Sequence, residues 1–178
     1  MGEKAIEGSV AGRPPLWSTV ISTWFGAGLL PLAPGTWGTI AAVPLAWALD
    51  RVGGEVALVT ALVIVTVVGS IAADVYCKAT GRHDNQKIVV DEVAGYLLTL
   101  VAVTRTPLHL VLAFVLFRLF DIWKPPPVRS IDRHVHGGFG VVADDLGAGV
   151  YGAIVLWLLV HFGVAARIGA VIPIAWMK

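Results

Sequence analysis

The sequence contains few charged residues: Asp, Glu, Lys and Arg make up 14% of its 178 residues, whereas hydrophobic residues make up 57%. A soluble globular domain typically has about 25% charged and about 45–50% apolar residues. The formal net charge is only +1, so no overall electrostatic argument favours nucleic acid as a partner. The composition predicts an integral membrane protein, and the length predicts a single domain.

Cysteine is nearly absent as well. The single Cys77 excludes an internal disulfide framework and a multi-cysteine zinc site. A charged segment followed directly by an apolar core is also lacking at the start of the chain, so we expect no secretory signal there. We expect residues 1–16 to form a polar N-terminal tail on the cytosolic side, and residues 17–178 to form one membrane-embedded domain.

Long apolar runs, in contrast, are abundant. They cover residues 36–50, 55–77, 88–104, 107–123 and 146–166, with a shorter apolar tail at 168–177. Because about 20 residues are needed to cross the hydrocarbon core of a bilayer, several of these runs are short, and a buried hairpin or a partly crossing helix stays an alternative. The pattern predicts an all-α integral membrane bundle of about five hydrophobic helices.

The basic residues indicate how such a bundle would be oriented, since Lys and Arg favour cytoplasmic loops. With five crossings and a cytoplasmic N-terminus, the expected inner basic residues are Lys4, Arg13, Lys78, Arg82, Lys87, Lys124, Arg129 and Arg133. The expected outer ones are Arg51, Arg105, Arg167 and Lys178. This asymmetry predicts a multi-pass protein of the cell inner (cytoplasmic) membrane, with cytoplasmic loops at 78–90 and 124–145.

Six acidic residues are expected at helix ends on that same cytoplasmic side: Asp84, Asp91, Glu92, Asp121, Asp144 and Asp145. Taken singly, each has a structural explanation, because Asp91 and Asp144 are plausible helix N-caps and Arg118 and Asp121 can form an ion pair. Taken together, crowded carboxylates repel one another unless cations neutralise them. Oxygen-rich sites of this kind suit Mg²⁺, so the sequence predicts a polar metal site.

Basic and histidine residues lie among these acids in the sequence. Lys124, Arg129 and Arg133 belong to a proline-rich loop and could bind phosphate oxygens, although attraction to lipid headgroups would use the same residues. His83 could transfer protons or be solvated. Thr36 follows a Gly- and Pro-rich stretch and could cap a helix whose free N–H groups face an anion.

Four segments of the chain resemble the phosphatidylglycerophosphatase A family. They are PLAPGTWGT (31–39), HDNQKIVVDEVAGY (83–96), FRLFDIWKPPPVRSIDR (117–133) and GGFGVVADDLGAGVY (137–151). The FDxxKP and DD-x-x-A/G-G-x-Y elements are specific to the family, whereas the PPP run replaces the Pro-aromatic-Pro often seen in it. The resemblance implies a Mg²⁺-dependent membrane phosphatase that removes the terminal phosphate of phosphatidylglycerophosphate to give phosphatidylglycerol.

The resemblance also implies roles for individual residues. It assigns the metal to the six acids named above. The expected catalytic residues are His83, Asp84, Asp121 and Lys124. The expected substrate-binding residues are Thr36, Arg118, Lys124, Arg129 and Arg133. We favour direct attack by water over a phospho-enzyme, and we expect the membrane lipid as the partner, with no nucleic acid and no obligate protein partner.

Two other classes of protein stay open at this point. A small ion transporter would also use intramembrane acids, but it would place some of them near mid-span, where Asp74 is the only candidate. A structural membrane protein would have no reason to concentrate acids and bases on one face.

Overall fold

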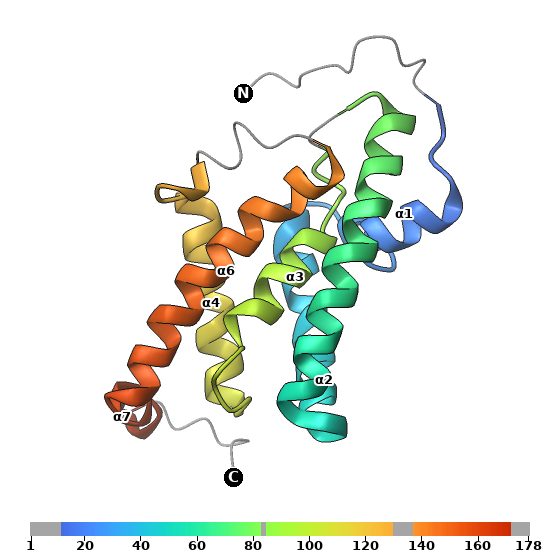
Figure 1. Cartoon of the computed structure of the whole chain (residues 1–178). Helices are drawn as coiled ribbons and strands as arrows, with labels where there is room; N and C mark the ends of the chain where they lie inside the picture. Colours follow the sequence, from blue (N-terminus) through green and yellow to red (C-terminus); the bar gives the residue numbers. More distant parts are fainter. Residues whose placement is uncertain (1–11, 83–84, 130–136, 172–178) are drawn as a thin grey trace.

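The computed structural model describes residues 12–82, 85–129 and 137–171. The elements within these ranges are α1 (Leu16–Ser22), the short 3₁₀ helix η1 (Ala27–Leu29), α2 (Pro34–Thr80), α3 (Val90–Thr99), α4 (Pro107–Trp123), α6 (Gly138–His161) and α7 (Val164–Val171). Figure 1 shows their arrangement, and the described residues contain no β-strand. The all-α prediction is therefore confirmed, whereas α1 was not predicted.

Helix α2 consists of two arms joined by a sharp turn at Gly53 and Gly54. Gly54 has φ 56° and ψ −132°, and Gly53 has φ −156°. Glycine adopts the positive φ at the turn without the steric cost that a side chain would add. The arms, residues 34–52 and 55–80, run in opposite directions (Figure 1), and they correspond to the first two apolar runs of the sequence.

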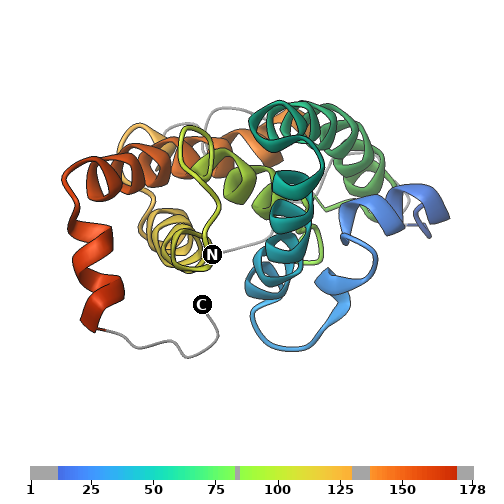
Figure 2. The ribbon, with the colours of Figure 1, turned by 90° about the horizontal axis from the view of Figure 1, so that it is seen from below.

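The helices form two layers, which are visible when the bundle is viewed along its axis (Figure 2). One layer contains α6, α3 and the second arm of α2, and the other contains α4 and the first arm of α2. Helix α3 packs against both α6 and α2, while α4 packs mainly against α6. The short α3 is consequently surrounded by longer helices, and most of its residues are buried.

Glycine allows α3 and α6 to approach until their backbones touch. A Cβ atom added to Gly149 would lie 2.5 Å from the carbonyl oxygen of Gly95, closer than real Cβ contacts occur. The hydroxyl of Thr99 donates to the carbonyl of Gly149 at 3.4 Å, across 50 residues of sequence. Small residues permit this kind of close helix packing, which is common in membrane bundles.

Large apolar side chains fill the space around this contact. The core cluster includes the fully buried Tyr96, Leu97, Phe117 and Leu156. The hydroxyl of Tyr96 donates to the carbonyl of Leu110 at 3.1 Å, which satisfies the one polar group that this ring brings into the core.

Helix α4 has the boundaries that the apolar run at 107–123 predicted. Thr106 caps its start by accepting a hydrogen bond from the backbone N–H of His109 at 3.2 Å, and Pro107 occupies the first turn. Proline suits this position because its missing N–H would have no partner there. At the other end Lys124 takes a left-handed conformation with φ 46°, and the prolines that follow cannot continue the helix.

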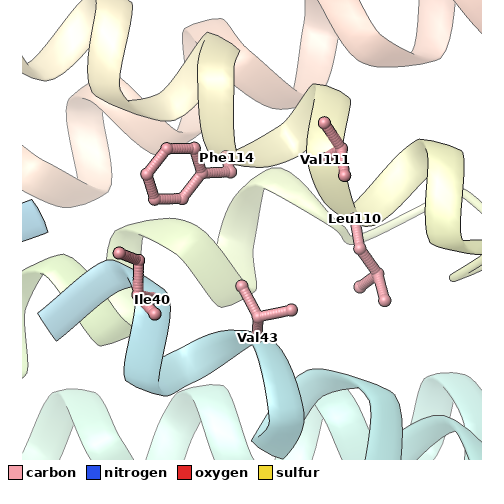
Figure 3. Close-up of a pocket in the computed structure, with 5 residues that line it drawn as sticks. All are labelled: Ile40, Val43, Leu110, Val111 and Phe114. Carbon is pink, nitrogen blue, oxygen red and sulfur yellow. The ribbon is translucent and has the colours of Figure 1, made fainter. Parts of the chain in front are cut away.

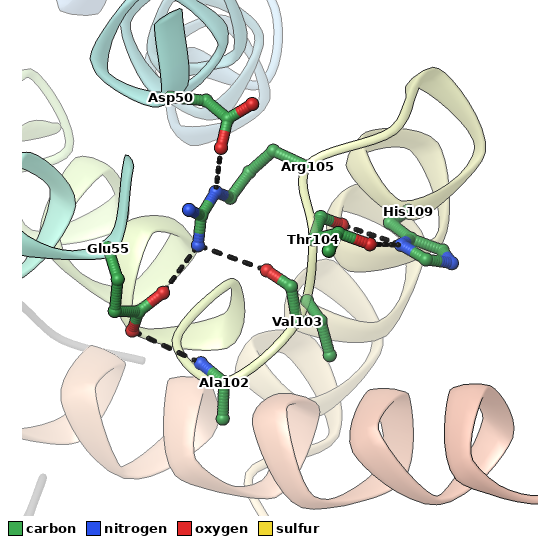
Figure 4. A network of polar contacts seen from close by, with 7 residues as sticks. All are labelled: Asp50, Glu55, Ala102, Val103, Thr104, Arg105 and His109. Carbon is green, nitrogen blue, oxygen red and sulfur yellow. Dashed lines mark hydrogen bonds and ion pairs between the residues drawn. The ribbon is translucent and has the colours of Figure 1, made fainter. Parts of the chain in front are cut away.

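A polar network ties the turn of α2 to the connection between α3 and α4 (Figure 4). The buried guanidinium of Arg105 donates to Asp50 at 2.8 Å, to Glu55 at 2.5 Å and to the carbonyl of Val103 at 3.0 Å. Glu55 also accepts from the backbone N–H of Ala102 at 3.3 Å. The network fixes the end of the bundle at which α2 turns, where α4 begins.

Two of the described helices are long and apolar enough to cross a membrane, by length and composition. They are α2, with a most apolar window of mean hydropathy 2.6, and α6, with a value of 1.5. Helix α4, with 17 residues, is about 25 Å long. The count of about five crossings stays a prediction.

Candidate functional site

Three carboxylates from two helices converge at the end of the bundle opposite Arg105. Asp91 and Glu92 lie in the first turn of α3, and Asp145 lies on α6. One oxygen from each of these side chains lies within 4.8 Å of the others. Groups this close repel strongly when ionised, and burial of Asp145 strengthens the repulsion by excluding water.

Backbone contact between α3 and α6 explains why these carboxylates meet. A Cβ atom on Gly95 would lie 2.6 Å from the carbonyl oxygen of Asp145, so the residue that carries the α6 carboxylate packs directly on α3. The first turn of α2 closes the site from another side, because a Cβ atom on Gly35 would collide with Oε1 of Glu92 and lie 3.0 Å from Nη1 of Arg118. A methyl group at Gly95 would therefore push α3 and α6 apart, whereas one at Gly35 would displace the ends of the Glu92 and Arg118 side chains.

Two further acids surround this trio. Asp121 lies near the end of α4 and repels both Glu92 and Asp145, while Asp144 on α6 repels Asp91 and Asp145. The Asp121 and Asp144 side chains are 14% and 11% exposed, so the site is shielded from solvent without being sealed. We call the five residues the carboxylate cluster: Asp91, Glu92, Asp121, Asp144 and Asp145.

Two cationic side chains of α4 and its C-terminal cap contact the cluster. Arg118 donates to Asp121 at 2.5 Å and lies 3.9 Å from Glu92. Lys124 donates to Asp144 at 2.6 Å. The ion pair that the spacing of Arg118 and Asp121 allows is therefore present, and Lys124 lies beside an acid of the cluster.

The cluster has unused capacity to bind a cation. Arg118 contacts Asp121 and Glu92, and Lys124 contacts Asp144, whereas the trio of Asp91, Glu92 and Asp145 brings three carboxylates within 4.8 Å of one another. Oε2 of Glu92 and Oδ2 of Asp145 are buried without a hydrogen-bond partner in the described part of the chain. Buried unpaired carboxylate oxygens are costly, and hard divalent cations prefer oxygen ligands. The donor set therefore fits Mg²⁺.

The N-cap predictions for two of these acids are wrong. The N-cap of α6 is Gly137, so Asp144 lies about two turns inside the helix instead of opening it with Asp145. Contact with α2 accounts for the earlier start, since the N–H of Gly138 donates to Asp74 at 3.3 Å. The N-cap of α3 is Val89, and Asp91 accepts a hydrogen bond from the N–H of Glu92 at 3.1 Å.

Thr36 does not cap a helix either. Helix α2 begins at Pro34, and its N-cap is Ala33 in a left-handed conformation with φ 48°. Thr36 instead follows Gly35 within the first turn, beside the site. Arg129 is exposed to solvent. His83, Asp84 and Arg133 lie outside the described residues, so their predicted roles stay predictions.

One contact near the site was not predicted. The hydroxyl of Tyr151 on α6 donates to the carbonyl of Pro126 at 2.6 Å, and its ring packs against Phe120 with centroids 5.5 Å apart. This contact holds the proline segment after Lys124 against α6. The sequence did carry a signal for it, because Tyr151 ends the segment 137–151 with its DD-x-x-A/G-G-x-Y spacing, although the tyrosine was not given a role.

The chain is similar to known proteins over most of its length. Residues 20–160 match the family model described as phosphatidylglycerophosphatase A. Phosphatidylglycerophosphatase A from Escherichia coli (strain K12) is 39% identical over 144 residues, which cover 80% of this chain and 83% of the relative. The Haemophilus influenzae protein of the same name is 35% identical over 148 residues, covering 80% and 88%.

A third relative carries a different name. A Bacteroides thetaiotaomicron protein, named provisionally as a phosphatidylinositol-3-phosphatase, is 37% identical over 150 residues, which cover 81% of this chain and 94% of the relative. No solved structure matches the chain. The family match covers all five members of the carboxylate cluster, and the chain belongs to the phosphatidylglycerophosphatase A family, a family of phosphatases.

Proposed function

We propose that the protein is a Mg²⁺-dependent lipid phosphatase that hydrolyses the terminal phosphate of phosphatidylglycerophosphate to phosphatidylglycerol and inorganic phosphate. The observation that carries the proposal is the carboxylate cluster with Arg118 and Lys124 at its edge. A site for a phosphate monoester needs positive charge for the phosphate oxygens, and a hydrolytic site also needs an activated water. The cluster and its two cations offer side chains for both requirements.

The metal would be held by Asp91, Glu92 and Asp145, whose oxygens lie within 4.8 Å of one another. Asp121 and Asp144 lie close enough to complete the ligand set or to orient it. Bound there, Mg²⁺ would offset the negative charge of the phosphate and favour the activation of an attacking water. The unpaired oxygens of Glu92 and Asp145 support this assignment.

The cations of α4 would bind the phosphate. Nε of Arg118 is buried without a hydrogen-bond partner among the described residues, so it can donate to a phosphate oxygen while Nη1 holds Asp121. Guanidinium and ammonium groups are the usual protein donors to phosphate. Lys124 can reorient its flexible ammonium group from Asp144 toward the substrate.

Other parts of the mechanism stay proposals from the sequence. Direct attack by water is the simpler route, since Cys77 is buried in the packing of α2 and no dedicated nucleophile motif is present. His83 and Asp84 are proposed for proton transfer and metal binding, and Thr36, Arg129 and Arg133 for substrate contacts.

The surface of α2 supports a location in the membrane. Along its second arm, Val56, Val63, Val67 and Ile71 are all more than half exposed. Their spacing of seven, four and four positions puts them on one stripe of the helix, and an extended exposed apolar stripe needs an apolar surrounding. We propose that both arms of α2, together with α4 and α6, cross the bilayer, and that α3 with the connection after it makes a short fifth crossing.

The orientation follows from the basic residues. The carboxylate cluster lies at the end of the bundle where the second arm of α2 stops. The last turn of α2 and the described segments that follow α2 and α4 at this end carry Lys78, Arg82, Lys87, Lys124 and Arg129. The positive-inside rule places these segments in the cytoplasm. The substrate phosphate would therefore be bound at the cytoplasmic face of the inner membrane.

A transporter is a weaker alternative, because Asp74 is already engaged in structural contacts. Its carboxylate binds Lys78 at 2.6 Å and accepts from the N–H of Gly138. The Bacteroides relative favours a second phosphatase candidate, a phosphoinositide monoester as substrate. The same site chemistry would serve either lipid, since both present a phosphate monoester at the membrane surface.

Phosphate release by the purified chain in detergent tests these proposals. We expect release from phosphatidylglycerophosphate, its loss in excess chelator and its recovery when Mg²⁺ is restored. A phosphatidylinositol 3-phosphate reaction run in parallel separates the two substrates. Absence of phosphate release from both lipids would contradict the phosphatase proposal, and full activity in chelator would contradict the metal.

A further inference from the structure

An apolar groove lies between the two helices of the second layer. It has a volume of about 260 Å³ and is lined by Ile40, Val43, Leu110, Val111 and Phe114. Figure 3 shows Ile40 and Val43 on the first arm of α2 facing the three side chains of α4 across the opening. We call it the α2–α4 groove. Its lining is entirely apolar.

On α4 the lining of the groove leads directly to the site. Arg118, Phe114 and Val111 are spaced by four and three residues, so they lie on one stripe of the helix. The guanidinium at the top of this stripe contacts Asp121 and Glu92. The phenyl ring of Phe114 begins the groove one helical turn below it.

The wall of the groove formed by α2 shows the same succession of apolar lining and polar site. On α2, Thr36, Ile40 and Val43 are spaced by four and three residues and form the opposite stripe. Gly35, which precedes Thr36, packs against Glu92 and Arg118. On each helix the apolar lining therefore stops about 6 Å, or four residues, before the residue beside the polar site: Ile40 before Thr36 on α2, and Phe114 before Arg118 on α4.

We propose that the α2–α4 groove holds the part of an acyl chain nearest the headgroup of the lipid whose phosphate is bound at the carboxylate cluster. The proposal rests on the proposed phosphatase function, because it assigns the apolar half of the same substrate. A lipid phosphate monoester is polar at one end and apolar at the other, and the site and the groove follow one another in that order.

The shape of the groove suits a chain that enters from the side. Ile40 and Val111 are 43% and 44% exposed and form its rim, whereas Leu110 at 6% exposure forms its base. Pockets that enclose a whole drug-sized ligand have about 300–1,000 Å³, and the groove is smaller than that. It therefore takes a segment of one chain, and the rest of the lipid stays in the bilayer.

The groove would contribute orientation more than affinity. Lipid tails are as apolar as leucine side chains, so moving a chain from the bilayer into the groove gains little hydrophobic free energy. Fixing the chain, however, limits how the glycerol and its phosphate can rotate above the site. Correct orientation of a reacting group is a large contribution to catalysis.

Filling the groove tests the proposal. Val43→Trp and Val111→Trp would occupy it from either wall, and Val63→Trp is the matched control, since Val63 is 56% exposed on the other arm of α2. With a long-chain diacyl phosphatidylglycerophosphate in detergent, we expect kcat/KM of both groove variants to fall about tenfold or more. With the deacylated, water-soluble phosphate ester, we expect them to match the control.

The outcomes separate this inference from the proposed function. Equal loss on the acylated and deacylated esters would overturn the groove assignment, because the substitutions would then act through the fold. Unchanged turnover of both esters would overturn it too. A wild-type chain that releases phosphate from neither ester would instead contradict the proposed function.

Photo-crosslinking tests occupancy of the groove without relying on turnover. A diacyl lipid phosphate monoester with a diazirine near the ester end of one chain is irradiated with the wild-type protein in detergent. We expect the label on peptides that contain residues 40–43 and 110–114. Excess unlabelled lipid phosphate should remove it, whereas the same diacyl lipid without the phosphate should not. Equal competition by both lipids, or labelling elsewhere alone, would overturn the proposal.

Discussion

Lys124 and Asp144 join the end of α4 to the interior of α6, with Nζ of the lysine 2.6 Å from Oδ2 of the aspartate. The lysine has φ 46°, which ends α4 and directs its side chain from the helix cap. The lysine and Asp144 side chains are 29% and 11% exposed. The pair therefore places an ammonium group at the more exposed edge of the carboxylate cluster.

Asp121→Asn should abolish catalysis while preserving the fold. The amide keeps the shape of the side chain but removes a charge that a hard cation or its ligand shell requires, so activity per folded molecule should fall about a hundredfold or more. Phosphate release, normalised to the monodisperse fraction, measures this. If the carboxylate serves only Arg118, the variant will lose stability and its folded fraction will keep normal turnover.

Lys124→Ala should weaken substrate binding and leave the metal requirement intact. Loss of a charge-assisted contact to phosphate should raise KM about tenfold to a hundredfold. Lys78→Ala is the matched control, because Lys78 also binds an aspartate at 2.6 Å and lies near the same end of the bundle. Steady-state kinetics at several Mg²⁺ concentrations distinguish the variants, and equal KM values would remove Lys124 from phosphate binding.

Gly149→Ala should impair both stability and activity. The added methyl group would collide with the carbonyl of Gly95 and force α3 and α6 apart, at a cost of about 1–3 kcal/mol. Asp145 would then move away from the acids of α3. The unfolding temperature and the turnover should both decrease. Gly169→Ala is the control, because its methyl group meets only the end of the Leu108 side chain, and it should change neither quantity appreciably. Normal activity in Gly149→Ala would contradict this account of the site.

Arg105→Ala should lower stability without affecting turnover. The guanidinium is 6% exposed, but its partners Asp50 and Glu55 are 30% and 46% exposed, so solvent screening limits the loss to about 1–3 kcal/mol. The network lies at the end of the bundle opposite the carboxylate cluster. Unfolding temperature and activity per folded molecule measure the two effects. A selective loss of activity would show that this network also influences the site.

Cysteine labelling tests the orientation. In a Cys77→Ser background, a cysteine replacing Asn85 should resist impermeant thiol reagents in intact cells, whereas one replacing Val52 at the turn of α2 should react. After permeabilisation the cysteines at both positions should react, which controls for the intrinsic reactivity of each thiol. Val52 is 86% exposed, so its labelling depends on sidedness and not on burial. The reverse pattern would place the site outside.

The sequence was sufficient to predict features that depend on local patterns. The boundaries of α4 follow from Pro107 at its start and the prolines after Lys124. The pair of Arg118 and Asp121 follows from a separation of three residues on a helix. The gathering of the acids at one end follows from alternating helix directions, and the structure places Asp91 near Asp145 as expected.

Features that depend on tertiary contacts were not predicted. Glycines have low helix propensity, so residues 137–140 gave no signal for a helix start, yet packing against Asp74 begins α6 there. Helices in proteins gain most of their stability from such packing. The close approach of Gly95 and Gly149 was also not foreseen, because neither residue reveals from sequence which neighbour it faces.

The contact between Gly95 and Gly149 also has a consequence for the order in which the protein is made. Asp91, Glu92 and Asp121 leave the ribosome before Asp145, and the hydrogen bond from Thr99 to Gly149 spans 50 residues. Chains fold from the N-terminus as they are synthesised, so the earlier helices form without the Asp145 carboxylate that completes the trio. A nascent chain that has not yet docked α6 has no complete site, so hydrolytic activity has to wait until α6 has been synthesised and has packed against α3.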